Sequence, residues 1–327
     1  MFTPSGSFIE THTALSDQAT KAIYKLRTYL NKFTNLSVKH TLELFDKLIL
    51  PILNYASEVW WFSNENKIER IHTKFCKQLL GVKSQTQNNF VYGELGRTTL
   101  KVHRFLAAIR YWLKIVHYED DKYIKAVYKM MLSDMELYPN KKSWASEMKR
   151  LIESLGLNYA WLQQGVGNIN SFISLCKQRL NDQFIQKWSE EINSSSRADT
   201  YKLFSDFGFK PYLNDVTVTK FRKSFTRLRL SSHRLEVEVG RWHKPNKIPR
   251  NERKCRICNT LEDEFHFLFE CSLYSDIRKI YIKPHFWRYP NMIKFIELMK
   301  SDDTTTIRKL ANYVHKSFEI RNRNYII

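Results

Sequence analysis

The sequence is poor in the two residues that most often interrupt regular structure. Its 327 residues include only 9 glycines and 8 prolines. Because both residues mark turns and loops, long elements with few tight turns are expected, which favours helix. A hydrophobic fraction of 43% is enough for a real core and argues against wholesale disorder. The length suits about two domains.

Signals for export and for membrane insertion are also missing. The N-terminus has no basic segment followed by an apolar run, so no signal peptide is expected. The most apolar stretch, LFDKLILPILNYASEVWWF, is interrupted by Lys47, Pro51, Asn54 and Glu58, and is expected to form a buried helix and a turn. We therefore expect a nuclear and cytoplasmic protein. In that reducing setting its odd number of cysteines, 5, favours metal binding over disulfides.

Apolar residues at helical spacing run along most of the chain and predict a mainly α protein. Ser16 and Ser37 are expected to cap the first two helices, Pro51 to end or kink the second, and Gly81 to close the third. The one strand signal is LEVEV, Leu235 to Val239, where apolar and acidic residues alternate. The expected helices cover about residues 16–30, 37–50, 68–80, 102–116, 122–136, 143–155 and 169–192.

Acidic residues are in the minority. The chain has 53 Lys and Arg against 33 Asp and Glu, a formal net charge of +20 that attracts polyanions. Half of this excess lies in residues 217–258, where thirteen Lys and Arg face three Glu and give a net charge of +10. Phe221, Phe225 and Trp242 are interleaved with these cations, a pattern that suits phosphate binding and base stacking.

Three of the cysteines and one histidine form the stretch CRICNTLEDEFHFLFEC. Its spacing is Cys-x2-Cys-x7-His-x4-Cys, with Cys255, Cys258, His266 and Cys271 as the four candidate ligands. Three thiolates and an imidazole are a usual set for structural Zn²⁺, and four protein ligands leave no open position for catalysis. Cys76 and Cys176 lie on apolar helix faces and are expected to be ordinary core residues.

Several stretches together resemble the C-terminal region of reverse transcriptases of LINE-type (non-LTR) retrotransposons, including jockey-like elements. They are FTPSGSF, LILPILNYASEVWWF, GELGR (Gly93 to Arg97), and LRLSSHRLEVEVGRW leading into the Cys/His cluster. The resemblance covers nearly the whole chain, in the order thumb, helical linker, basic segment and Cys-Cys-His-Cys element.

The resemblance implies three regions with different roles. Residues 1–118 would be the thumb that holds a template–primer duplex, residues 119–216 a helical linker, and residues 217–327 the basic segment with the zinc element and C-terminal helices. The partners would be RNA or DNA, as template–primer or target site, together with polymerase domains upstream in a longer product. The expected nucleic-acid-binding residues are Arg227, Arg229, His233, Arg241, Arg250 and Arg253.

The polymerase chemistry of that family is not expected here. It needs paired aspartates that hold Mg²⁺ on a hairpin between apolar strands, and these should lie in a palm upstream of this chain. The sequence HYEDDKY contains Asp120 and Asp121, but it follows a long helix without flanking strands and is expected to be an acidic linker. Asp302 and Asp303 are expected at the N-terminus of the last helix, where negative charge is favoured.

Two other functions stay open at this stage. One is a free-standing nucleic-acid-binding protein derived from such an element, with the same zinc-dependent surface and no polymerase partner. The other is a basic helical scaffold or membrane-surface protein whose charge is only solvated, for which Lys-rich amphipathic faces would be typical.

The missing aspartate pair leads to a first prediction. The purified chain should not extend a primer on an RNA or DNA template in the presence of Mg²⁺. Primer-extension assays measure this directly, and Mg²⁺-dependent extension that is lost in a variant with Asp120→Asn and Asp121→Asn would contradict it.

Overall fold

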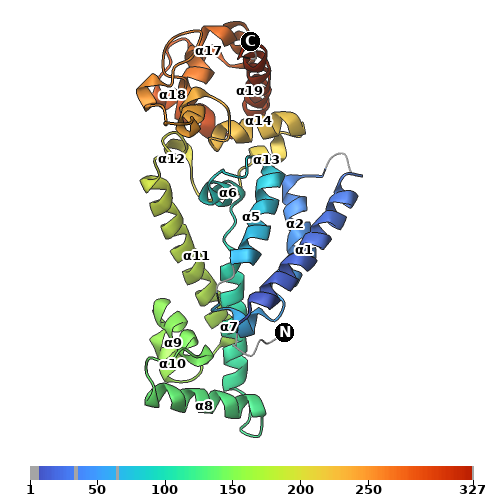
Figure 1. Cartoon of the computed structure of the whole chain (residues 1–327), viewed down its shortest axis with the longest axis vertical. Coiled ribbons are helices and arrows are strands. Elements are labelled where there is room, and N and C mark those ends of the chain that lie inside the picture. The colour runs from blue at the N-terminus through green and yellow to red at the C-terminus, as the bar shows by residue number, and fades with distance from the viewer. Residues whose placement is uncertain (1–6, 33–35, 64–65, 326–327) are drawn as a thin grey trace. The chain divides into compact units, whose positions relative to one another are not determined.

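The computed structural model describes residues 7–32, 36–63 and 66–325 and is built from helices (Figure 1). Within this part of the chain, extended pairing is limited to two isolated bridges, Leu95 with Phe209 and Lys254 with Leu261. The expected mainly α class is therefore confirmed. No helix of the described residues is long and apolar enough to cross a membrane. Residues 2–6 of the stretch FTPSGSF lie outside the described residues.

By its packing the chain divides into two compact units. Unit 1 is formed by the described parts of residues 1–32, 44–72 and 98–187, and unit 2 by those of residues 33–43, 73–97 and 188–327. Each unit is drawn from three separate segments because the helices α2 (Val38–Leu48), α5 (Asn66–Leu80) and α11 (Ile169–Ser194) contribute residues to both. The boundaries of these two packing units therefore differ from those of the three regions 1–118, 119–216 and 217–327 that the resemblance implies.

Unit 1 is held together by an aromatic and aliphatic core around Trp112. Trp112 is fully buried and its indole nitrogen donates a hydrogen bond of 2.9 Å to the Tyr128 hydroxyl. The Trp161 ring stacks on Trp112 at 5.8 Å. Burial raises the pKa of Tyr128 to about 12, so this hydroxyl stays neutral. The helices of unit 1 are α1 (Ile9–Leu30), α3 (Leu50–Leu53), α4 (Ser57–Trp60), α7 (Leu100–Val116), α8 (Tyr123–Leu137), α9 (Trp144–Ser154) and α10 (Asn158–Leu162).

The expected helix ends are confirmed except at the first helix. The Ser37 side chain accepts a hydrogen bond from the His40 amide at the start of α2, and Gly81 follows α5 with a φ of +70°. Pro51 stands at the start of α3 and separates it from α2. The expectation for Ser16 is wrong: α1 begins at Ile9, and Ser16 is a buried residue inside it.

Unit 2 contains the end of α5, the end of α11 and the helices that surround the cysteine cluster. Within it, α14 (Thr219–Arg229) packs against α19 (Thr304–Tyr325). The other helices are α6 (Asn88–Leu95), α12 (Tyr201–Phe204), α13 (Tyr212–Asp215), α15 (Glu236–Val239), η1 (Gly240–Trp242), η2 (Arg250–Glu252), η3 (His266–Glu270), η4 (Ser272–Tyr274), α16 (Ser275–Tyr281), α17 (Pro284–Trp287) and α18 (Met292–Lys300).

A buried ion pair stands at the centre of unit 2. Arg229 of α14 donates from Nε to Glu94 Oε1 of α6 at 2.5 Å and from Nη1 to the Met299 carbonyl at 2.6 Å. Its guanidinium also lies 4.7 Å from the centre of the Phe204 ring. Burial acts to lower the pKa of Arg229, but attraction and hydrogen bonding to Glu94, together with the nearby Tyr212 and Tyr201, outweigh it and that pKa is raised. Arg229 is therefore a charged part of the core.

The short strand expected at Leu235 to Val239 is wrong, because Glu236 to Val239 form the helical turn α15. The amides of Glu238 and Val239 both donate to the Leu235 carbonyl, which closes the turn. The Glu236 amide donates to the Glu262 side chain at 2.7 Å. The hydrogen bonds to the Leu235 carbonyl and to Glu262 thus favour a helical turn, although the alternating sequence pattern is typical of a strand.

The central ion pair generates a stability prediction. Arg229→Ala should lower the free energy of unfolding by about 3–5 kcal/mol, because it leaves the Glu94 carboxylate buried without its partner. Urea denaturation followed by circular dichroism measures the loss. The control is Arg288→Ala on an exposed arginine, which should change the stability by less than about 0.5 kcal/mol. Equal unfolding midpoints for both variants would contradict the role of Arg229.

Candidate metal centre and the basic surface beside it

Two of the four candidate ligands lie on a tight hairpin. The Cys255 amide donates to the Thr260 carbonyl at 2.7 Å, and the Asn259 amide donates back to the Cys255 carbonyl at 2.9 Å. Asn259 has a φ of +54°, a conformation that asparagine tolerates well. The turn is narrow because only two residues separate Cys255 from Cys258, and it brings both thiols to one side.

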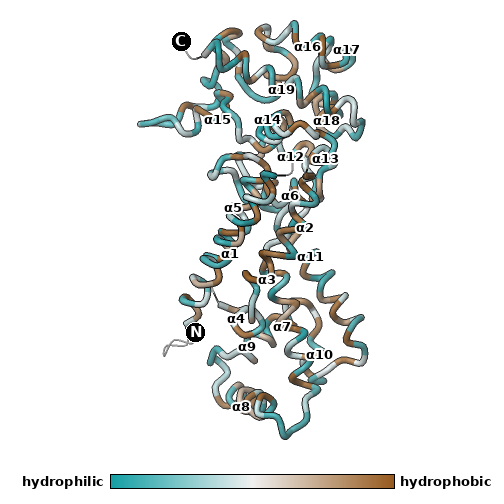
Figure 2. Tube along the Cα trace, turned by 90° about the vertical axis from the view of Figure 1, so that its right-hand side faces the viewer, coloured by the Kyte–Doolittle hydropathy of each residue, from teal (hydrophilic) through white to brown (hydrophobic). Residues whose placement is uncertain are grey.

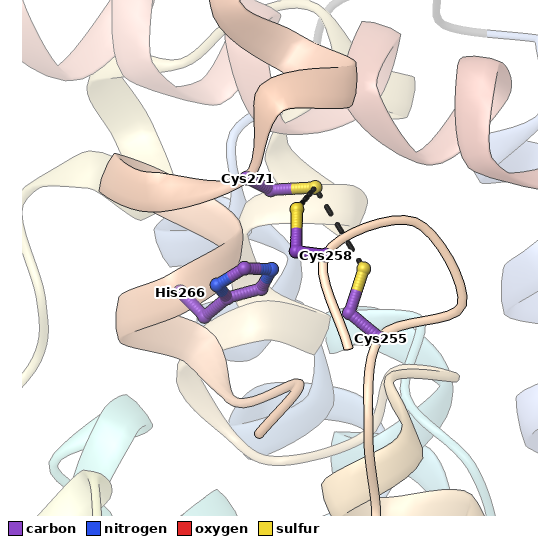
Figure 3. Close-up of side chains that lie close together, drawn as sticks. All are labelled: Cys255, Cys258, His266 and Cys271. Carbon is purple, nitrogen blue, oxygen red and sulfur yellow. Dashed lines mark hydrogen bonds between the residues drawn. The ribbon is translucent and has the colours of Figure 1, made fainter. Parts of the chain in front are cut away.

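The other two ligands lie at the ends of one helical segment. His266 begins the π-helix η3, and Cys271 caps its C-terminus with its amide donating to the His266 carbonyl at 2.9 Å. The wider turn of a π-helix accommodates the four-residue spacing and presents both side chains to the hairpin. Figure 3 shows the three sulfur atoms and the imidazole ring converging from these two segments.

The distances fit one tetrahedral metal ion. The Sγ atom of Cys271 lies 3.9 Å from that of Cys255 and 3.8 Å from that of Cys258. All four ligand atoms lie within 4.8 Å of one another. A tetrahedral site with metal–sulfur bonds of about 2.3 Å places its sulfur atoms about 3.8 Å apart. Since the three cysteines form no disulfide, these four residues can hold a metal ion.

The histidine supplies an independent test of this fit. His266 Nε2 is buried and has no hydrogen-bond partner, which is costly for a polar atom unless a ligand binds it. Its other nitrogen, Nδ1, lies 3.2 Å from the Thr260 hydroxyl and 3.4 Å from Glu270 Oε2. A carboxylate on the far nitrogen is the usual partner of a metal-bound histidine, because it fixes the ring and its tautomer.

The thiols differ in their readiness to ionise. Burial raises the pKa of Cys271. Burial acts in the same direction on Cys258, but hydrogen bonds with Ser272, Cys271 and Cys255 together outweigh it and the pKa of Cys258 is lowered. The Ser272 hydroxyl lies 3.4 Å from the Cys258 sulfur. Cys258 therefore supplies a thiolate more readily than Cys271 does.

Carboxylates just after the hairpin tie it to the helices of unit 2. Arg321 of α19 donates to both oxygens of Glu262, at 2.9 and 2.7 Å. His233 Nε2 lies 2.9 Å from Glu264 Oε1, and the Thr200 hydroxyl donates to Glu264 Oε2 at 2.8 Å. Burial alone would raise the pKa of Glu264, but the hydrogen bond and charge of His233, with further hydrogen bonds from the backbone and Thr200, outweigh it and that pKa is lowered.

The same hairpin holds the base of an exposed basic loop, which we define as residues 243–250. The Glu262 amide donates to the Arg253 carbonyl, and the Arg253 guanidinium donates to the carbonyls of Ile248 and Val237, both at 2.9 Å. Gly240 lies close to it: a Cβ atom there would lie 2.7 Å from the Arg253 side chain, so any larger residue would displace that side chain. Arg253 therefore links the end of the basic loop to α15 through these hydrogen bonds.

The basic loop carries its charge in solvent. Lys244, Lys247 and Arg250 are exposed, and the Ile248 amide donates to the Gly240 carbonyl to close the loop. Figure 2 shows a largely hydrophilic segment that projects beside α15. A loop of this kind presents cations away from the body of unit 2.

An aromatic side chain lies at the start of the basic loop. Trp242 is 58% exposed, and the Arg197 guanidinium lies 5.2 Å from the centre of its ring. The Asp199 carboxylate lies 3.9 Å from the Arg250 guanidinium and 4.0 Å from the Arg241 guanidinium. Two carboxylates, Asp199 and Glu238, lie beside the more numerous cations here and leave a local excess of positive charge.

The structure divides the six residues expected to bind nucleic acid. Arg227 and Arg250 are exposed and can contact a ligand. Arg241 is partly buried and pairs with Glu238 at 2.8 Å. The remaining three, Arg229, His233 and Arg253, are at most 9% exposed, and the partners described above occupy them. Burial argues against the expected contact for these three, which hold the fold instead.

Sequence reasoning did not single out three cations whose charges interact in unit 2. They are Lys83, Arg197 and Arg234. Burial is the main cause that lowers the pKa of Lys83, and the positive charges of Arg234, Arg227 and Arg197 lower it further. A pattern within one segment could not have revealed this grouping.

The acidic pairs have the roles expected from the sequence. Asp120 and Asp121 lie in the exposed turn between α7 and α8, where Asp120 pairs with Lys129 at 2.7 Å. Asp303 accepts hydrogen bonds from the amides of Thr305 and Thr306 at the start of α19. Cys76 and Cys176 are buried in helices, as expected for core residues.

Comparisons with protein-family models, with curated proteins and with solved structures give no match to this chain.

The converging ligands predict one bound metal ion per chain. Cys258→Ala should remove most of the metal found by mass spectrometry, since it deletes one of four ligands. The matched control, Cys176→Ala, removes a buried thiol that is no part of the cluster and should leave the metal content unchanged. Because metal binding and local folding are coupled, chelation should make residues 243–271 sensitive to protease. Equal metal content in both variants would contradict the site.

Proposed function

We propose that this chain is a nucleic-acid-binding protein in which a structural Zn²⁺ ion holds a basic surface of unit 2 in one shape. We further propose that it derives from the C-terminal region of a LINE-type reverse transcriptase. The observation that carries the proposal is the anchoring of the exposed basic loop to the Cys-Cys-His-Cys hairpin, through Arg253 and Glu262.

Zinc is the metal that best suits the donor set. Three thiols and one imidazole favour a borderline-soft ion with tetrahedral geometry, and Zn²⁺ meets both requirements. With all four positions filled by protein, the ion supplies folding energy and no open site for water. Its role in this proposal is to fix the hairpin on which the basic loop depends.

The ligand class follows from the side chains on the surface. Exposed Lys244, Lys247 and Arg250 can neutralise successive phosphates, and such contacts supply most of the affinity in binding without sequence preference. Trp242 offers a π-face on which a base can stack. Arginine also binds phosphate through two parallel hydrogen bonds, which lysine cannot do.

The polymerase reaction itself is not part of the proposal. Mg²⁺ would be bound by the palm of a reverse transcriptase, and the paired aspartates of residues 117–123 lie on an exposed turn, where Lys129 pairs with Asp120. Gripping template–primer or target nucleic acid requires none of that chemistry. The same surface would serve a free-standing protein derived from such an element.

The salt dependence of binding tests this proposal. Replacement of Lys244, Lys247 and Arg250 together by Ala should weaken binding to RNA and DNA of any sequence. It should also flatten the plot of log affinity against log salt by up to three contacts' worth, at about 0.7 to 0.9 per contact. Fluorescence anisotropy at several salt concentrations measures both effects.

A control with the same loss of charge is available in unit 1. Lys122, Lys129 and Lys141 are exposed and each pairs with an aspartate. Their replacement by Ala should leave the slope nearly unchanged. If both triple variants weaken binding equally, the positive charge acts diffusely and the basic loop is no special site.

A further inference from the structure

Unit 2 contains a cavity of about 490 Å³ that none of the preceding contacts uses. It lies among the segment after α5, the C-terminal half of α14 and the last turns of α19. Sites for small ligands commonly have volumes of about 300–1,000 Å³, so this one can take a single nucleotide.

Three cations line the cavity. Lys83 is held by a bond from its Nζ atom to the His233 carbonyl at 2.7 Å, and Arg227 by a bond from its Nε atom to the Gly81 carbonyl at 2.6 Å. Arg234 is exposed beside them. The first two side chains are thus positioned in advance, which reduces the entropy lost when an anion binds. Burial and the neighbouring arginines lower the pKa of Lys83, and a bound phosphate would relieve this repulsion.

The rest of the lining differs from a plain phosphate site. Phe318 supplies an apolar wall, and its ring is fixed by stacking on Phe267 at 4.7 Å. His315 is held by the Ser224 hydroxyl at 2.9 Å, and Glu319, the one acidic lining residue, lies 3.3 Å from His315 Nε2. An aromatic wall, a fixed imidazole and a carboxylate suit the π-face and exocyclic groups of a nucleobase better than inorganic phosphate.

We infer that this cavity binds one unstacked nucleotide of a single strand, with its phosphate at Lys83, Arg227 and Arg234 and its base toward Phe318. The inference rests on the proposed function and adds the class of strand to it. A base can enter a cavity only when it is free of its duplex partner, so the site favours single strands, loops and ends.

A variant that fills the cavity without altering charge tests the inference. Asn322 lines the cavity from an exposed position on α19, so Asn322→Trp should occlude it without disturbing the core. We expect this variant to bind a single-stranded RNA of about 12 nucleotides about five- to tenfold more weakly than the unmodified protein. Binding of a blunt DNA duplex should stay within about twofold, since the duplex contacts the surface through phosphates alone.

A second variant and two controls complete the experiment. Arg234→Ala should also weaken single-strand binding, and Arg288→Ala, on an exposed arginine outside the cavity, should not. Adenosine 5′-monophosphate should displace the single strand at lower concentration than adenosine or inorganic phosphate, because only the nucleotide fills both parts of the cavity.

The outcomes separate the two proposals. Unchanged single-strand binding by Asn322→Trp would overturn the cavity site, while weakened binding by the basic-loop variant would still support the proposed function. If the unmodified protein binds neither single strand nor duplex, both proposals fail. Equal weakening for single strand and duplex would also overturn the inference, because the cavity would then contribute no strand preference.

Discussion

The convergence of three thiols on one point is the constraint on which the basic surface of unit 2 depends. Sulfur atoms 3.8 and 3.9 Å apart would repel one another as thiolates, and a cation removes that repulsion. Once the hairpin is fixed, Glu262 and Glu264 behind it reach Arg321 and His233 of the helical frame. The basic loop in turn is anchored to the hairpin through its base. The position of the exposed cations therefore depends on a series of contacts that starts at the candidate metal ligands and runs through Glu262 and Arg253 to the basic loop.

The buried charges of unit 2 change how the composition of its basic segment is to be understood. A net charge of +10 over residues 217–258 suggests a continuous phosphate-binding strip. Arg229 and Arg253 nevertheless point into the fold, where Glu94 and backbone carbonyls satisfy them. Arginine suits such positions because its planar guanidinium forms several hydrogen bonds at once and stays charged when buried. Part of the arginine enrichment in this segment is thus structural, and the accessible charge is smaller and more localised than the count implies.

What the sequence could predict was local. The ligand set followed from the spacing of residues 255–271, and most helices followed from their apolar periodicity, because both signals lie within one segment. The strand expected at LEVEV failed because polar partners from residue 262 settle the conformation of that segment. The burial of Arg229 and His233 could not be predicted for a similar reason: their partners, Glu94 and Glu264, lie 135 and 31 residues away in the sequence. Whether an arginine faces solvent or core is a tertiary property.

The cavity is a second feature that the sequence could not reveal, here because an accessible cation lies far from the basic segment in sequence. Lys83 lies about as far from the basic segment in sequence as Glu94 does, and nothing near it signals a binding site. Its place beside Arg227 and Arg234 arises because its amide donates to the Ser232 hydroxyl at 2.8 Å, which pins the segment after α5 against the end of α14. The exposed loop and the cavity would then divide recognition. The exposed lysines of the loop would attract any phosphate backbone, whereas the prearranged cations and the apolar wall of the cavity would accept only a nucleotide whose base is free. Strand preference would thus come from shape, and affinity from charge.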